Sequence, residues 1–165
     1  FNSKKYLENL LGKEIKMFCY PGGKLSDIAV KEIKNAGFIG ARTTELFQFD
    51  VKDPYLMGTT INCYPFPLRK GGLAAKIQPL RKSFAPILEL GLPWKSFLSW
   101  KNLAKSLFDH AEKRKSIFHL WGHSWEIEKN GIWKELEDVY KYISGRSGCR
   151  YLTNSEVIDL LSRKD

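Results

Sequence analysis

IKMFCYPGGKLSDIAVKEIKNAGFIGART, residues 15–43, has the pattern of a strand, a turn, a helix and a second strand. The opening IKMFCY is apolar enough for a buried strand, and the Pro-Gly-Gly turn ends it. Ser26 can cap a helix that stops at Gly37, and FIGART, residues 38–43, follows as the next strand. A strand, a helix and a strand in succession indicate parallel pairing through a right-handed crossover.

The alternation of strands and helices returns in the C-terminal part of the chain. Apolar residues from Trp100 to Ala111 recur at helical spacing, and SIFHLWG, residues 116–122, follows as a strand. The further elements expected are a first helix ended by Gly12, a helix over 133–143, a short strand at 149–152 and a last helix behind a Thr153–Glu156 capping box. This order predicts the α/β class.

Residues 44–98 interrupt the pattern. Six of the seven prolines fall here, together with Gly71-Gly72, and no helical or strand periodicity is sustained. Only GTTINCY, residues 58–64, has the composition of a short strand. We expect an irregular insertion at about 44–98 within one domain that covers residues 1–165.

The charge and the cysteines limit the classes of function. The net charge is +9, but Lys and Arg are scattered over the expected helix faces without an aromatic RNA-binding motif, so nucleic acid is an unlikely partner. A charge-driven nucleic-acid binder is kept as an alternative, and its affinity would collapse with added salt. Cys19, Cys63 and Cys149 form neither a disulfide framework nor a Cys-x-x-Cys zinc site. Free thiols favour a cytoplasmic location without fixing it, and no apolar run is long enough for a membrane span.

FHLWGHSWEIE, residues 118–128, contains two of the three histidines. The His119 to His123 spacing can hold zinc on a helix, because residues four apart then share a face. On a strand the same residues lie roughly 13 Å apart, at about 3.3 Å per residue, and cannot share an ion. Trp121 and Gly122 favour a strand. The sequence therefore predicts no histidine clamp, but places His123 at a strand end, where parallel sheets bind ligands, with Ser124 to Glu126 in a loop.

Two stretches resemble the polysaccharide deacetylases, carbohydrate esterase family 4. FCYPGGKLSDIAVKEIKNAGFIGART is similar to the third motif of that family, an aromatic residue and Pro-x-Gly at a strand tip, followed by a helix and a Gly-Phe turn. HLWGHSWEIE, followed by a Trp-Leu helix, resembles the fifth motif, in which a histidine closes a strand. The two stretches extend over most of 1–43 and 99–161. The resemblance implies the C-terminal portion of a distorted (β/α)7 barrel whose N-terminal strands are missing.

The resemblance implies metal-dependent hydrolysis of N-acetyl groups from an amino-sugar polymer or oligosaccharide. In that reaction a divalent ion, usually zinc, polarises the acetyl carbonyl, and His123 protonates the leaving amine. The Gly22 N–H stabilises the oxyanion. The candidate substrate contacts are Trp125, Trp121, Tyr20 and Glu126. The alternatives are rim packing for Trp125 and a solvated or helix-capping carboxylate for Glu126.

The chain also departs from the family pattern. Cys19 stands where the family commonly has an arginine, and Trp121 replaces a smaller aliphatic residue of the acetate pocket. The family's paired aspartates and metal histidines would precede Phe1, so we expect no metal ligand in this chain and a zinc-type ion only in the complete domain. The expected partners are an N-acetylated carbohydrate and the missing barrel half, or a second copy that covers the open sheet edge. The alternative function is non-catalytic carbohydrate binding or a scaffold role on the same fold.

Overall fold

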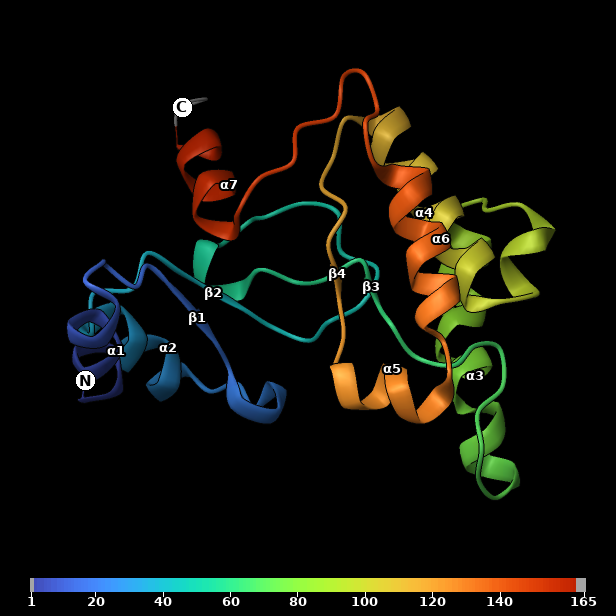
Figure 1. The fold of residues 1–165 in the computed structure, drawn as a ribbon, viewed down its shortest axis with the longest axis horizontal. Coiled ribbons are helices and arrows are strands. Elements are labelled where there is room, and N and C mark those ends of the chain that lie inside the picture. Colours follow the sequence, from blue (N-terminus) through green and yellow to red (C-terminus); the bar gives the residue numbers. More distant parts are fainter. Residues whose placement is uncertain (1, 163–165) are drawn as a thin grey trace. The chain divides into compact units, whose positions relative to one another are not determined.

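The computed structural model describes residues 2–162, which divide into two compact units (Figure 1). Unit 1 contains the residues up to Glu45, Asp50–Gly58, and the residues from Arg150 onward. Unit 2 contains Leu46–Phe49 and Thr59–Cys149. Helices make up 54% of the structure, and the strands form two small parallel sheets of two strands each.

The prediction of a (β/α)7 barrel is wrong. Parallel pairing does occur, between Met17–Cys19 (β1) and Gly40–Arg42 (β2), and between Ile61–Asn62 (β3) and Leu120–Trp121 (β4). Within residues 2–162 these two pairs remain separate sheets, and neither closes into a barrel. The apolar runs that predicted longer strands find a hydrogen-bonding partner over only two or three residues, so most of each run carries no strand assignment.

Unit 1 packs three helices with the β1–β2 pair. The helices are Asn2–Leu11 (α1), Asp27–Asn35 (α2) and Asn154–Leu161 (α7), with short 3-10 turns at Pro21–Gly23 (η1) and Pro54–Leu56 (η2). The predicted caps are confirmed, because the Ser26 hydroxyl accepts from the Ala29 N–H and Thr153 forms a capping box with Glu156. The buried core of this unit is Tyr20, Ile33, Phe38 and Ala41.

Unit 2 packs its helices around the β3–β4 pair. They are Leu73–Glu89 (α3), Trp94–Phe97 (η3, a 3-10 turn), Trp100–Arg114 (α4), Ser124–Asn130 (α5) and Trp133–Ile143 (α6). The apolar stripe predicted from Trp100 onward is confirmed, since Trp100, Leu107 and Ala111 are all buried. They meet Ile87 of α3 and Val139 of α6 in one core.

Three local expectations need correction. Residues 73–89, expected to be irregular, form the 17-residue helix α3 with Pro79 and Pro86 inside it. Proline lacks the N–H of a helix interior, so two of them hid the helix in the sequence. Ser124 to Glu126, expected as a loop, open α5, and the expected strand at 149–152 does not form.

The helices of the described residues include none that is both long and apolar enough to cross a lipid bilayer.

The core of unit 2 allows a direct test of the packing. Leu107 is fully buried in α4, whereas Leu73 at the start of α3 is 78% exposed. Replacing Leu107 by Ala removes buried methyl groups and leaves a cavity, so we expect Leu107→Ala to lower the free energy of unfolding by about 2–5 kcal/mol. Leu73→Ala should cost less than about 0.5 kcal/mol. Urea unfolding followed by circular dichroism measures both, and equal losses for the two variants would contradict the described packing.

Candidate functional site

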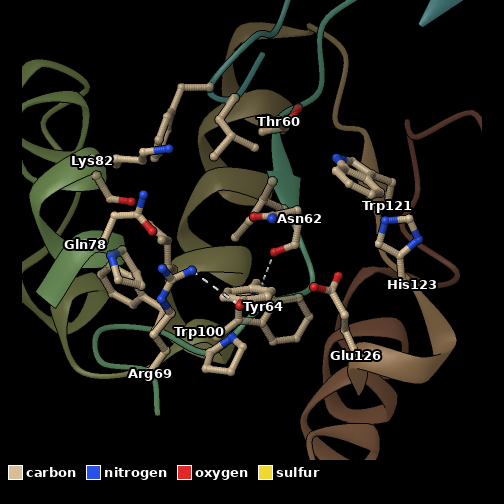
Figure 2. Close-up of a pocket in the computed structure, with 18 of the residues that line it drawn as sticks. Thr60, Asn62, Tyr64, Arg69, Gln78, Lys82, Trp100, Trp121, His123 and Glu126 are labelled. Atoms are coloured by element: carbon tan, nitrogen blue, oxygen red, sulfur yellow. Dashed lines mark hydrogen bonds between the residues drawn. The ribbon is translucent and has the colours of Figure 1, made fainter. Parts of the chain in front are cut away.

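A cavity of about 390 Å³ lies within unit 2, and its lining comes from five parts of that unit. These parts are the Leu46–Phe47 segment, β3 with the chain that follows it, the face of α3, the first turn of α4, and the end of β4 with the start of α5. The lining mixes aromatic rings with amide, carboxylate and cationic groups, and ten of these side chains are labelled in Figure 2. A small number of polar groups in a largely apolar pocket of this size is typical of small-molecule sites.

Trp100 anchors the cavity to the core. Its ring is 2% exposed, and its indole N–H donates to the Asn62 carbonyl oxygen at 2.7 Å. The bond satisfies the one polar atom of a buried indole and fixes the end of β3 over α4. Asn62, the last residue of β3, and Tyr64, which follows this strand, are thereby held at the cavity wall.

The end of β4 and the start of α5 supply three aromatic rings to the cavity. The His123 ring lies edge to face against Trp121, with centroids 5.1 Å apart, and stacks on Trp125 at 5.7 Å and 22°. His123 is exposed and Trp125 is 61% exposed, so both rings present open surface. Within residues 2–162 the His123 ring nitrogens make no hydrogen bond, which leaves both available to a ligand.

Glu126 completes this wall from the first turn of α5. Its carboxylate points into the cavity beside His123 (Figure 2), while its carbonyl oxygen accepts from the Asn130 side chain at 2.7 Å. Glu126 forms no ion pair with any described residue. The carboxylate is therefore also free for a ligand.

The opposite wall carries cations. Figure 2 shows Arg69, Gln78 and Lys82 facing Trp121, His123 and Glu126 across the cavity. The Arg69 guanidinium donates through Nε to the Ala75 carbonyl at 2.8 Å and through Nη1 to the Tyr64 hydroxyl at 3.3 Å. Gln78 and Lys82 are four residues apart on α3 and share one face of that helix.

Gly122, the residue directly after β4, sets the distance between the two strands at the cavity. A Cβ at Gly122 would lie 2.9 Å from the Cys63 Cβ, closer than side chains approach one another. The Cys63 N–H also donates to the Trp121 carbonyl at 2.8 Å. Cys63 is fully buried, and this burial raises the pKa of its thiol to about 12, so the thiol is a packing group rather than a nucleophile.

The predicted site residues divide between the two units. His123, Trp121, Trp125 and Glu126 line the cavity of unit 2, whereas Gly22 belongs to unit 1. Gly22 has a left-handed backbone, with φ of 61°, and nothing within 4 Å of the position of a Cβ. This open turn is accessible to a ligand. The structure does not bring Gly22 and His123 together within one unit.

Tyr20 also belongs to unit 1, where it is a core residue. It is 2% exposed, its hydroxyl donates to the Tyr55 carbonyl at 3.0 Å, and burial raises the pKa of its phenol. A side chain in this position supports the turn at Gly22 and offers no open ring face to a sugar.

The two histidines of the 118–128 stretch have different roles. His119 Nδ1 lies 2.8 Å from the Thr59 hydroxyl, away from the lining of the cavity, whereas His123 is part of that lining. Among the described residues, no three His, Cys, Asp or Glu side chains form a group that could hold a metal ion.

Sequence reasoning missed the β3 and α3 side of the cavity. Asn62, Tyr64, Arg69, Gln78 and Lys82 all fall in the stretch that was expected to be irregular, and Trp100 was identified only as a core residue. The available signal was a cluster of polar and aromatic residues around GTTINCY. Without the helix α3, nothing in the sequence placed this cluster opposite His123.

The chain matches no protein-family profile, no curated protein and no solved structure.

The close approach at Gly122 predicts a measurable cost. Gly122→Ala must push β4 away from Cys63, and we expect it to lower the free energy of unfolding by about 1–3 kcal/mol. Gly72→Ala is the matched control, because Gly72 has nothing within 4 Å of its Cβ position and an ordinary φ of −60°. Thermal unfolding of both variants provides the measurement. A Gly122→Ala protein as stable as the Gly72→Ala protein would show that the strands are not held this closely.

Proposed function

We propose that this chain binds an N-acetylated amino sugar of an oligosaccharide or polymer in the unit 2 cavity and takes part in the hydrolysis of its N-acetyl group. The observation that carries the proposal is the set of rings at Trp121, His123 and Trp125, which lie beside the Glu126 carboxylate and face amide and cationic groups across one cavity. Sugar rings have apolar C–H faces that pack on aromatic rings, and hydroxyl groups that need polar partners. The cavity offers both.

His123 is the proposed proton donor to the leaving amine. Imidazole is the side chain most often used for general acid and base catalysis, and this ring has both nitrogens free of hydrogen bonds to the described residues. Glu126 projects into the same part of the cavity and is placed to accept hydrogen bonds from sugar hydroxyls (Figure 2).

The resemblance to the deacetylases also implies a divalent ion, which would supply Lewis acidity toward the acetyl carbonyl when bound. The described residues contain no group of three His, Cys, Asp or Glu that fits such an ion. The role proposed for this chain is therefore limited to sugar binding and proton donation, and no step passes through a metal held by these residues.

A second candidate is carbohydrate binding without hydrolysis. It requires only the rings and polar groups that line the unit 2 cavity, without an oxyanion donor or a metal ion. The two candidates predict the same ligand. They differ in whether replacement of His123 lowers the rate of acetate release.

Binding of N-acetylglucosamine trimers, measured by isothermal titration calorimetry, tests the shared part of the proposal. Trp125→Ala removes an open stacking surface, and we expect about a tenfold loss of affinity, which corresponds to about 1.4 kcal/mol. Trp94→Ala is the matched control, because Trp94 is 74% exposed and does not line the cavity. Equal affinities for the Trp125→Ala and Trp94→Ala proteins would contradict the proposed site.

Release of acetate from the same trimers, measured on the complete domain with zinc added, separates the two candidates, because the residues described here supply only sugar binding and proton donation. His123→Gln should leave trimer affinity within about twofold of the wild type but reduce the rate of acetate release by about a hundredfold or more. A wild-type protein that binds the trimer and releases no acetate would support binding without hydrolysis. A protein that does not bind the trimer would contradict both candidates.

A further inference from the structure

The charged groups of the cavity are separated onto opposite walls. Arg69 and Lys82 stand on the wall formed by the β3 exit and α3, and Glu126 stands beside His123 on the other (Figure 2). Neither cation forms an ion pair with Glu126 or with any other described carboxylate. The cavity therefore has a cationic end that nothing in the described chain neutralises.

Arg69 is held in place with part of its guanidinium free. The bond from Nε to the Ala75 carbonyl and the bond from Nη1 to the Tyr64 hydroxyl use two of its five N–H donors, and the guanidinium carbon lies 5.7 Å from the centre of the Tyr64 ring. Both nitrogens of the Nη pair keep donors, the arrangement that binds a carboxylate or phosphate through two hydrogen bonds. The side chain is already ordered, so little side-chain entropy is lost when an anion binds.

Helix α3 brings Lys82 to the same wall as Arg69. Ser83 and Ile87 are the buried residues of α3, and they fix which face of the helix meets the rest of unit 2. Lys82 and Gln78 lie on the cavity side of this helix and line the cavity with Arg69. An ammonium group with three donors on the same wall as a guanidinium edge favours an anion at that wall.

Trp121 adds an independent sign of a missing ligand. Its indole N–H is buried and has no acceptor among the described residues, although the ring lines the cavity. A buried donor without a partner costs about 1–3 kcal/mol, and an acceptor atom inside the cavity would remove that cost.

We propose that the amino sugar bound in this cavity carries an anionic group, a carboxylate or a phosphate, which binds to Arg69 and Lys82. The inference rests on the proposed function and narrows its substrate class. The anionic group lies toward α3, away from Glu126, so the N-acetyl end of the sugar is directed to His123. This orientation separates recognition on one wall from proton donation on the other.

Three related probes test the inference: N-acetylglucosamine, N-acetylmuramic acid and N-acetylglucosamine 6-phosphate. The first is neutral, the second carries a carboxylate and the third a phosphate. Calorimetry should show one or both of the anionic sugars binding about tenfold more tightly than the neutral one, and the tighter of the two identifies the anionic group. Displacement of the anionic sugar by excess neutral sugar is expected, because both occupy one cavity.

Lys82→Gln and Arg81→Gln form the matched pair of variants. Arg81 is the exposed neighbour of Lys82 on α3 and does not line the cavity. Lys82→Gln should reduce the ratio of anionic-sugar affinity to neutral-sugar affinity by about fivefold or more, whereas Arg81→Gln should leave this ratio unchanged. Arg69→Lys, which keeps the charge and loses the two-bond geometry, should also reduce the preference.

Four results would overturn the inference. Equal affinity for the neutral and anionic sugars would refute it and leave the proposed function standing. Equal effects of Lys82→Gln and Arg81→Gln would show general charge attraction rather than a site. Failure of the neutral sugar to displace the anionic one would place the anion elsewhere. Failure of all three sugars to bind would refute the proposed function together with the inference.

Discussion

One buried hydroxyl holds the centre of unit 2 together. Thr60 is fully buried, and its Oγ1 donates to the Gln48 carbonyl at 2.9 Å and accepts from the His119 N–H at 3.0 Å. The Thr60 N–H returns a bond to the His119 carbonyl at 3.0 Å. Three chain segments that are remote in sequence thus share one side chain, and buried polar groups that would otherwise be unsatisfied find partners. The β3–β4 pair is only two residues long. The hydrogen bonds of Thr60 therefore hold together segments that a longer strand ladder would otherwise connect. Both walls of the cavity depend on this pair.

Local sequence signals predicted the local structure well. Ser26 and the Thr153–Glu156 capping box begin their helices as expected, and the apolar stripe from Trp100 forms α4. The same signals could not predict whether the sheet closes into a barrel. Closure depends on which extended segments pair with one another, whereas hydrophobic periodicity shows only which face of a segment is apolar. The parallel pairing of β1 with β2 was predictable from the intervening helix, whereas the number of paired residues was not.

The sequence predicted the residues on one wall of the candidate site but not those on the other. His123, Trp121, Trp125 and Glu126 stood out because they are concentrated in one short stretch, and all four line the cavity. The facing wall was not predicted, because Pro79 and Pro86 led us to expect an irregular segment where α3 forms. The assembled cavity has two chemically different walls: open aromatic rings with a carboxylate on one, and cations with an amide on the other. A ligand with an apolar face, hydroxyl groups and one charged group would find partners on both walls, and the proposed amino sugar has these three features.

The central claim is that a sugar binds in the cavity beside β4, and the indole N–H signals of the five tryptophans report on it directly. A titration with N-acetylglucosamine trimer, followed by ¹H–¹⁵N NMR with each tryptophan assigned by mutation, is the most direct measurement. The account predicts that the Trp121 and Trp125 signals shift in a saturable way, with Trp121 moving downfield as its unpartnered N–H gains an acceptor, while the Trp94 and Trp133 signals stay in place. Unchanged Trp121 and Trp125 signals at millimolar sugar, or shifts of equal size at Trp94, would contradict it.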